Sequence, residues 1–447
     1  MKRDVPTTYQ QWHRQYGDKV SLVTGPYRLF MFFHPDDVHE LLVGNAKSLI
    51  RLPRVMKTLE QWNGSSLLVL EGQPWARQRR LVSPAFQPRR LEGYGAEMVR
   101  ETTRLLESWR PRLEANGHLD VEIDQAMTRL SLAIICRTLF DCDVAELADE
   151  IKHSVAVLSD VAFDEVQAPF RWPLWLPTAY NRRKRAAMRC LDEFVRGLVR
   201  TRRQEGVDHG DLLSMLLTAV DEEGAAQSSS SPDAIRLTDE QVRNELMTLL
   251  LAGHDTTAAA LDWLWCCLAR DAEVTERCVR EVQSVLGTEP PTTTCLPQLP
   301  CLTAAIKESL RLYPAAIGLF LRQCTSDIAV GGQRIPARSL LAVSSFVTQR
   351  DPRWFPDPER FDPSRFLDGK DKQLPACSYF PFGVGPRVCI GQTFALTEIT
   401  LVAATLLQSL TPTTVPGEEA MPGWELKMAL RPQPGARVRW LLRSRSA

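Results

Sequence analysis

The stretch "FPFGVGPRVCIG", residues 380–391, places one cysteine near the end of a loop rich in residues that control the backbone. Three glycines, two prolines and an arginine surround Cys389. A buried core cysteine needs no such loop, because it behaves as a small hydrophobic residue that any well-packed pocket accepts. A thiolate that binds a metal needs tight turns around it, which glycine permits. The stretch therefore predicts that Cys389 is a metal ligand.

The residues after Cys389 predict a helix that begins near Gly391. The first turn of a helix has unpaired backbone N–H groups and the positive end of the dipole, and both favour a thiolate over a thiol. An inert buried cysteine is the alternative interpretation, and it is the better one for the other ten cysteines. Those ten form neither CxxC zinc pairs nor a secreted disulfide pattern, so we expect them to be reduced, as in a cytoplasmic protein.

The loop resembles the haem-binding loop of the cytochrome P-450 superfamily. It matches the pattern F-x-x-G-x-R-x-C-x-G at every fixed position, namely Phe382, Gly385, Arg387, Cys389 and Gly391. The resemblance implies that Cys389 is the axial thiolate ligand of the iron of haem b, and that Phe382, Gly383, Arg387 and Gly391 contact this cofactor. A thiolate ligand donates electron density to the iron and favours cleavage of the O–O bond.

A second motif lies on a long predicted helix. Thr238 and Gln241 form a capping box, and the helix is expected to run to about Arg270, a length of roughly 48 Å at 1.5 Å per residue. Halfway along it stands "LLLAGHDTTAAA", residues 249–260. A glycine there costs ~1 kcal/mol relative to alanine, and small residues would let a planar cofactor lie against the helix.

This segment is similar to the A-G-x-D-T-T oxygen-activation motif of the same superfamily. The resemblance implies that Ala252 and Gly253 contact the haem. It also implies that Asp255 and Thr256 form an acid–alcohol relay that delivers protons during oxygen activation. The residue at the variable position of the motif, His254, is interpreted as facing solvent or a partner.

A third pattern concerns the support of the loop. In "KESLRLYP", residues 307–314, Glu308 and Arg311 share one helix face, and an exposed pair of this kind contributes only ~0.3–0.5 kcal/mol. The resemblance implies instead a buried network with a downstream arginine. Arg360 and Arg365 are the two candidates, and Arg365 is preferred because it is nearer the cysteine loop and follows "FD". The role of this network is structural.

Haem propionates need cationic partners. The resemblance implies that these partners include Trp75 and Arg79, which stand in the family's W-x-x-x-R pattern in "WARQR", residues 75–79, together with Arg322 and Arg387. Each of these arginines by itself is more typical of an ordinary surface charge.

The fold class that follows is mainly α with a small β-rich subdomain, in which the haem lies between the long helix and the cysteine loop. We expect residues 1–447 to form a single domain. Its β-rich parts are expected at about 18–50 and 326–346, and its helical parts at about 75–320 and 391–410. A polar linker at 224–233 is interpreted as a surface loop, and no internal repeat is found.

Composition limits the partners. The 54 lysines and arginines balance the 54 aspartates and glutamates, so no overall field favours nucleic acid. We find no signal-peptide h-region and no transmembrane run, so a soluble, cytoplasmic protein is expected. Family members usually have a longer lead-in before the first helix. The short start therefore indicates either a soluble bacterial-type member or the removal of residues.

The predicted function is a haem-thiolate monooxygenase that inserts one atom of O2 into a lipophilic substrate. Electrons derived from NAD(P)H are expected from a separate ferredoxin or flavodoxin-type partner, and the protein is expected to be a monomer. A haem-thiolate sensor without turnover is one alternative, and an isomerase or peroxide-using enzyme is another, but the intact Asp255-Thr256 pair disfavours both. A helical protein without haem is a further alternative, but it would leave the four motifs without an explanation.

Four apolar segments are expected to line the substrate pocket, with Leu67, Leu68 and Ile317 or Leu319 among the contacts. Ordinary core packing is the alternative for each of them. The segments are "SSLLVL" (65–70), "LMTLLL" (246–251), "AAIGLF" (315–320) and "WPLWLPTAY" (172–180). A charged or sugar-like substrate would find few hydrogen-bond partners there. We therefore expect a fatty acid, a terpenoid or an apolar polyketide-like molecule.

Overall fold

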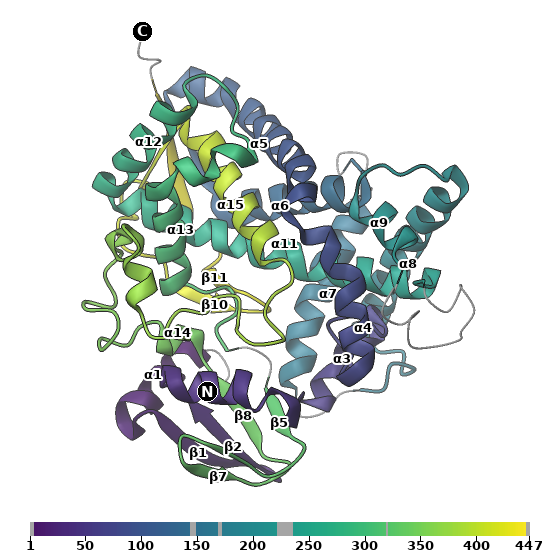
Figure 1. The fold of residues 1–447 in the computed structure, drawn as a ribbon. Coiled ribbons are helices and arrows are strands. Elements are labelled where there is room, and N and C mark those ends of the chain that lie inside the picture. The colour runs from purple at the N-terminus through teal and green to yellow at the C-terminus, as the bar shows by residue number, and fades with distance from the viewer. Residues whose placement is uncertain (1–3, 144–148, 169–171, 221–235, 319–320, 444–447) are drawn as a thin grey trace. The chain divides into compact units, whose positions relative to one another are not determined.

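A computed structural model describes residues 4–143, 149–168, 172–220, 236–318 and 321–443 of the chain (Figure 1). The chain divides into two compact units. The first unit comprises Met1–Leu52, Val99–Thr128 and Thr256–Ala447, and the second comprises Pro53–Met98 and Arg129–Asp255. Three helices continue from one unit into the other, namely α5 (Pro88–Asn116), α6 (Ile123–Phe140) and α11 (Asp239–Arg270).

The first unit contains a five-stranded sheet with the strand order β1-β2-β8-β5-β3. In Figure 1 its purple N-terminal strands lie beside green strands from the second half of the chain, because β2 pairs in parallel with β8. The other pairings in this sheet are antiparallel. The strands are β1 (Lys19–Thr24), β2 (Tyr27–Phe32), β3 (Leu49–Arg51), β5 (Arg322–Cys324) and β8 (Leu340–Val343).

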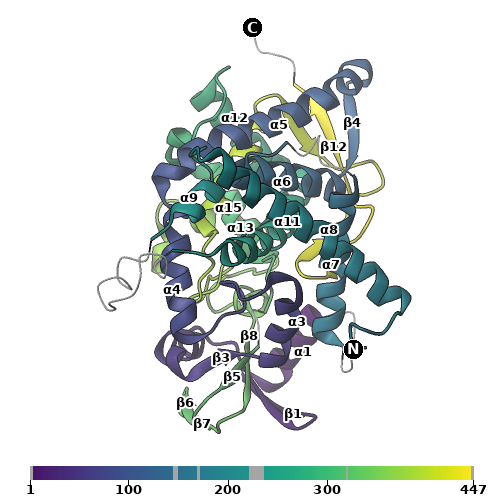
Figure 2. The ribbon, with the colours of Figure 1, turned by 90° about the vertical axis from the view of Figure 1, so that its right-hand side faces the viewer.

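Smaller sheets complete the β structure of the first unit. A three-stranded sheet has the order β4-β12-β9, and Figure 2 shows β4 beside the yellow C-terminal strand β12. Two further sheets are the pairs β6-β7 and β10-β11. The bounds are β4 (His118–Glu122), β6 (Ile328–Val330), β7 (Gln333–Ile335), β9 (Leu410–Thr413), β10 (Trp424–Leu426), β11 (Leu430–Pro432) and β12 (Arg437–Leu442).

The helices that belong wholly to the first unit include those that support the cysteine loop, α13 before it and α15 after it. Short π and 3-10 turns are labelled η. The elements are α1 (Val5–Tyr16), α2 (Pro35–His39), η1 (Glu40–Gly44), η2 (Ala46–Ser48), α12 (Ala272–Leu286), η5 (Thr293–Gln298), α13 (Pro300–Leu312), α14 (Ser345–Thr348), η6 (Pro363–Phe366), η7 (Lys370–Gln373) and α15 (Gln392–Leu407).

The second unit is helical. Besides the parts of α5, α6 and α11 that it contains, its elements are α3 (Pro53–Asn63), α4 (Gly72–Val82), η3 (Ser83–Phe86), α7 (Asp149–Gln167), α8 (Ala179–Glu205) and α9 (Leu212–Thr218).

Local signals in the sequence placed several elements correctly. The hairpin predicted around Gly25 is β1-β2, and this glycine has a φ of +57°, a conformation in which residues with a Cβ are rarely found. The predicted capping box is also present. The backbone N–H of Gln241 donates to the Thr238 hydroxyl at 3.2 Å, and the backbone N–H of Thr238 donates to the Gln241 side chain at 3.0 Å. The long helix α11 therefore starts and ends where the sequence predicts.

Other boundaries differ from the expectation. The helical part was expected at about 75–320, but α3 already begins at Pro53. At the other end, α13 ends at Leu312. The predicted linker at 224–233 lies outside the described residues. That the 447 residues form one domain stays a prediction.

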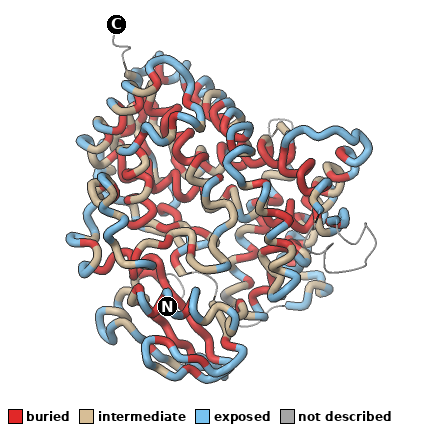
Figure 3. Tube along the Cα trace, in the orientation of Figure 1, coloured by how far each residue is buried: buried red, intermediate tan, exposed pale blue. Residues whose placement is uncertain are grey.

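Burial follows the pairing of the strands. In Figure 3 the inner strands of the five-stranded sheet are buried, whereas the outer strand β1 is mostly exposed. All four residues of β8 are buried, and so are the last four residues of β2. Phe380, at the start of the cysteine loop, packs in the hydrophobic cluster on this sheet together with Phe32 and Val343. The sheet therefore anchors one end of the loop.

Candidate active site

Hydrogen bonds and two left-handed glycines shape the cysteine loop in the first unit. The backbone N–H of Cys389 donates to the carbonyl of Phe382 at 3.0 Å, which closes the loop on itself. Gly383 and Gly385 both have a φ of +77°. A Cβ atom on Gly385 would lie 2.3 Å from the carbonyl oxygen of Leu42, so only glycine fits there. Close packing against Leu42 thus explains why the loop motif has a glycine at position 385.

Cys389 differs from the other ten cysteines in its exposure. It is exposed, whereas the others are buried or half-buried and none is in a disulfide. Helix α15 starts three residues later, with Gly391 as its N-cap. Burial raises the pKa of Cys266 to about 12, which keeps a core thiol of this kind protonated. The thiol at position 389 is therefore both accessible and next to the positive end of a helix.

The Glu308 carboxylate is the centre of a buried network in the first unit. Arg311 binds it through two hydrogen bonds, Nε to Oε2 at 2.7 Å and Nη2 to Oε1 at 2.8 Å, and both side chains are fully buried. Arg365 reaches the same carboxylate, with Nε 3.3 Å from Oε1. Arg360 contributes only its backbone carbonyl, which accepts from Arg311 at 3.2 Å. Of the two candidate arginines, Arg365 is the one whose side chain meets Glu308.

No motif in the sequence marked Gln349, but this residue joins the network to the cysteine loop. Its side-chain amide nitrogen donates to the carbonyls of Leu310 and Arg311 at 3.1 and 3.0 Å. Its side-chain oxygen accepts the backbone N–H of Phe380 at 2.7 Å, and its own carbonyl accepts from Arg311 at 2.8 Å. Gln349 is fully buried and thus transmits the position of α13 to the start of the loop.

The small-residue motif opens one face of α11. Helix positions 249, 252, 253 and 256 share a face, and these residues are half-buried or exposed although most of their neighbours along the helix are buried. Ala252 is the exposed one. A Cβ on Gly253 would lie 2.5 Å from the Cδ1 of Ile135, so packing against α6 also requires a glycine at this position. Asp255 and Thr256 are consecutive half-buried residues of α11.

The expectation for His254 was wrong. This side chain is 3% exposed and does not face solvent. Its Nδ1 lies 2.8 Å from the backbone carbonyl of Leu250, and since a carbonyl can only accept, Nδ1 carries the proton. The histidine lies on the buried side of the helix, where that carbonyl satisfies it.

The four candidate partners of the propionates are all half-buried. Trp75 and Arg79 lie one turn apart on α4 of the second unit and share a face of that helix. Arg322 lies on β5 and Arg387 in the cysteine loop, both in the first unit.

The predicted pocket residues have different surroundings. Leu67 is buried and Leu68 is half-buried in the second unit. Ile317 packs with Phe346 and Leu430 in a hydrophobic cluster of the first unit, so it also has a role in the core. Leu319 lies outside the described residues.

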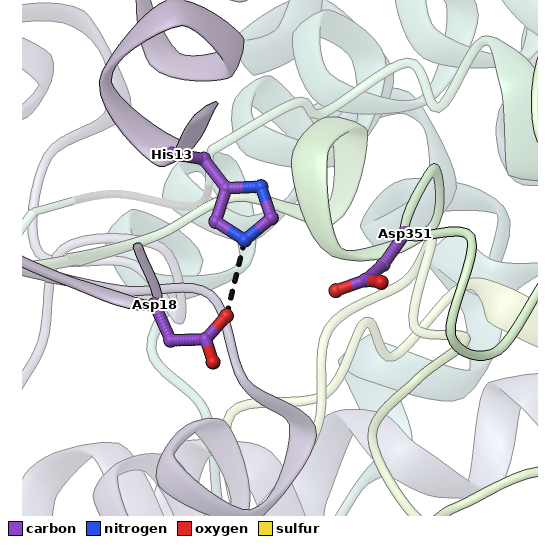
Figure 4. A group of neighbouring side chains, drawn as sticks. All are labelled: His13, Asp18 and Asp351. Atoms are coloured by element: carbon purple, nitrogen blue, oxygen red, sulfur yellow. Dashed lines mark hydrogen bonds and ion pairs between the residues drawn. The ribbon is translucent and has the colours of Figure 1, made fainter. Parts of the chain in front are cut away.

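One further group of side chains has metal-ligand chemistry, namely His13, Asp18 and Asp351 (Figure 4). His13 Nε2 lies 3.0 Å from Asp18 Oδ1. The guanidinium of Arg353 binds both carboxylates, with Nη1 2.9 Å from Asp18 Oδ2 and Nε 2.9 Å from Asp351 Oδ2. Hydrogen bonding to Arg353 is the main cause that lowers the pKa of Asp18 to about 2. An arginine thus already supplies the cation, and the group is a structural ion-pair cluster.

The family model of cytochrome P450 matches residues 2–440. The chain belongs to the cytochrome P450 family. Two relatives come from Streptomyces melanosporofaciens. Cyclooctat-9-en-7-ol 5-monooxygenase is 34% identical over 90% of this chain and 84% of the relative, and cyclooctatin synthase is 33% identical over 93% and 88%. Leukotriene-B4 omega-hydroxylase 3 of Mus musculus is 34% identical over 84% and 74%.

As a cytochrome P450, the protein is a haem-thiolate monooxygenase that uses haem b and receives NAD(P)H-derived electrons from a redox partner. The residues present fit this cofactor. The loop offers an exposed cysteine before the N-terminus of a helix, and α11 has a face of half-buried and exposed residues that includes Ala252, Gly253 and Thr256. None of the helices in the described part of the chain combines the length and the apolar composition that crossing a bilayer requires.

Proposed function

We propose that Cys389 is the axial thiolate in this cytochrome P450, and that Phe382, Gly383, Arg387 and Gly391 hold the cofactor at the loop. The observation that supports this most strongly is the exposure of Cys389 at the N-terminus of α15, on a loop that glycines close. When haem b is bound, it supplies the activation of dioxygen. The first turn of α15 stabilises the thiolate form of Cys389, and the network of Glu308, Arg311 and Arg365 holds the loop in place.

On α11, Ala252 and Gly253 provide the surface against which the cofactor lies. Asp255 and Thr256 hold and move a proton, with the Thr256 hydroxyl as the donor and the Asp255 carboxyl as its source. Arg79, Arg322 and Arg387 would neutralise the propionates, and the indole N–H of Trp75 would donate a hydrogen bond to one of them. The half-buried and exposed residues on one face of α11 support the first assignment, and the W-x-x-x-R spacing of Trp75 and Arg79 supports the last.

Replacement of Thr256 by alanine tests the relay. We expect Thr256→Ala to keep the cofactor and the ligand-induced spectral shift, because the hydroxyl is not needed for either. Product formation should fall by about 10²-fold or more, and most reducing equivalents should appear as hydrogen peroxide. The measurement is product and peroxide formed per NAD(P)H consumed.

Thr257→Ala is the matched control, because Thr257 is the neighbouring threonine and is buried. This variant should retain coupling. Equal coupling in Thr256→Ala and the native protein would remove Thr256 from the mechanism.

The proposed substrate is a lipophilic molecule such as a fatty acid, a terpenoid or an apolar polyketide-like compound. The support is the apolar composition of the four candidate wall segments, which include Leu67, Leu68, Ile317 and Leu319. A polar substrate would lose its hydration there without gaining hydrogen bonds. The relatives named for cyclooctat-9-en-7-ol and for leukotriene B4 point in the same direction.

A panel of ligands tests this substrate class. We expect a long-chain fatty acid or a cyclic terpene to shift the Soret band from its low-spin to its high-spin position at micromolar concentration. A free sugar of similar size should leave the band unchanged. Spectral titration gives the dissociation constants, and a response to the polar compounds alone would contradict the proposal.

The proposed electron donor is a ferredoxin or flavodoxin-type protein, because the 447 residues carry neither a dinucleotide-binding motif nor a four-cysteine iron–sulfur motif. We also propose a monomer in the cytoplasm. The eleven cysteines support that location, since none of them is in a disulfide.

A further inference from the structure

Glu245 is a buried carboxyl group to which the mechanism gives no role. It lies in the first half of α11, in the second unit, and is 0% exposed. Its Oε1 accepts two hydrogen bonds, from the backbone N–H of Leu67 at 2.7 Å and from the side-chain amide of Gln78 at 3.0 Å. Its Oε2 is buried and has no hydrogen-bond partner among the described residues. One oxygen thus fixes two segments to α11, while the other is buried without a hydrogen-bond partner among the described residues.

Three neighbouring contacts fix the same stretch of chain to α11. Arg243 Nη1 donates to the carbonyl of Trp62 at 2.8 Å, and the Thr248 hydroxyl lies 2.7 Å from that of Ser66. Gly64, with a φ of +57°, approaches α11 so closely that a Cβ would lie 2.3 Å from the side chain of Asn244. The chain from Trp62 to Leu67 therefore follows α11 contact by contact, and Glu245 holds the last of these positions.

The state of the carboxyl follows from its surroundings. An ionised carboxylate with one unpaired oxygen in a buried site is costly, so the neutral form is favoured. Burial raises the pKa of Glu245 to about 7, although the hydrogen bonds from Leu67 and Gln78 act in the opposite direction. No charged side chain contributes to this shift. On α11 the charge of Arg243 is paired with Asp192 at 2.6 Å, and the α4 residue that meets the carboxyl is the neutral Gln78.

We propose that Glu245 is a positioning residue that, in its neutral form, fixes the segment Ser65–Leu70 to α11 and thereby holds one wall of the substrate pocket. The assignment of this wall rests on the proposed function, in which Leu67 and Leu68 contact the substrate. Ionisation of Glu245 loosens the segment, so substrate affinity depends on pH through a group far along the chain from Cys389 and outside the proton relay.

The direction of the pH dependence follows from linkage. The carboxyl binds its proton more tightly when the segment is fixed than when it is released and solvated, where its pKa returns to about 4.5. The fixed state is therefore fully favoured below that value. Above it, the equilibrium constant between the fixed and the released state falls by roughly tenfold per pH unit up to about pH 7. This constant no longer changes above pH 7, where the carboxylate is ionised in both states.

Hydrogen exchange of the backbone amides of residues 64–70, measured on the haem-loaded protein between pH 5 and 8, tests the proposal. Protection factors corrected for intrinsic exchange should fall at least tenfold between pH 5.5 and 7 in the native protein, then level off. Glu245→Gln keeps the acceptor oxygen without the titration, so its protection should be high and independent of pH. Glu245→Ala should lose protection at every pH.

Thr248→Val is the matched control, because it removes the tie to Ser66 but no titratable group. It should lower protection uniformly and leave the pH dependence intact. Native pH dependence in Glu245→Gln, or native protection in Glu245→Ala, would overturn the proposal.

A parallel titration of a fatty-acid ligand by the Soret shift separates this inference from the proposed function. The dissociation constant of the native protein should rise over the same pH range in which protection falls, and that of Glu245→Gln should not. If protection behaves as expected and the ligand constant does not move, Glu245 fixes the segment and the segment is not a pocket wall.

Discussion

We expect Cys389→Ser to abolish the strongly red-shifted Soret band that is predicted for the reduced protein with carbon monoxide. This is the largest effect that we expect, because that band reports electron donation from a thiolate sulfur, and a serine oxygen at the same place supplies no thiolate. The loop itself should persist. Its closure uses the backbone N–H of residue 389 and two glycines, and the substitution alters none of them.

The control for this substitution is Cys377→Ser. Cys377 is a half-buried cysteine of the same unit that packs against the sheet cluster, twelve residues before Cys389. This variant should keep the native band. An unchanged spectrum in Cys389→Ser would remove Cys389 as the ligand, and loss of the band in Cys377→Ser would show that the loop is sensitive to any nearby change.

Glu308→Ala should be the most damaging substitution outside the loop. It removes the carboxylate that pairs with Arg311 and Arg365, and it leaves the fully buried guanidinium of Arg311 without a counter-charge. The cost of breaking a buried pair in this way is about 3–5 kcal/mol in the free energy of unfolding. Because Gln349 links this network to Phe380, the variant should also load less haem. Chemical denaturation and the ratio of haem to protein measure the two effects.

Asp371→Ala is the matched surface control. Asp371 pairs with Lys307, the residue next to Glu308 on α13, at 2.7 Å, and both side chains are partly exposed. Removal of a carboxylate there should cost less than ~1 kcal/mol and leave the haem content unchanged. Equal stability of Glu308→Ala and Asp371→Ala would mean that the buried network supports nothing.

The sequence was most informative where the chemistry depends on neighbours along the chain. The spacing of residues 382–391 identified the loop, and the pair Thr238 and Gln241 located the start of α11, because turns and caps are local. The i, i+3 spacing also paired Glu308 with Arg311.

Residues whose importance comes from distant contacts could not be found in this way. Gln349 carries no motif, and its role appears only when α13 and the cysteine loop are side by side. In the sequence Glu245 looks like an ordinary helix residue. Its role appears only from its burial and from the hydrogen bond that it accepts from the N–H of Leu67. His254 was misplaced because its variable position in the motif does not say which side of α11 it occupies.

The absorption spectrum of the reduced native protein under carbon monoxide tests the central claim most directly, because it needs neither the substrate nor the redox partner. The proposed ligation predicts a Soret band strongly shifted to the red, at the position that is typical of a thiolate trans to carbon monoxide. A band at the position of histidine-ligated haem, or purified protein without any bound haem after expression with sufficient iron and haem precursor, would contradict it.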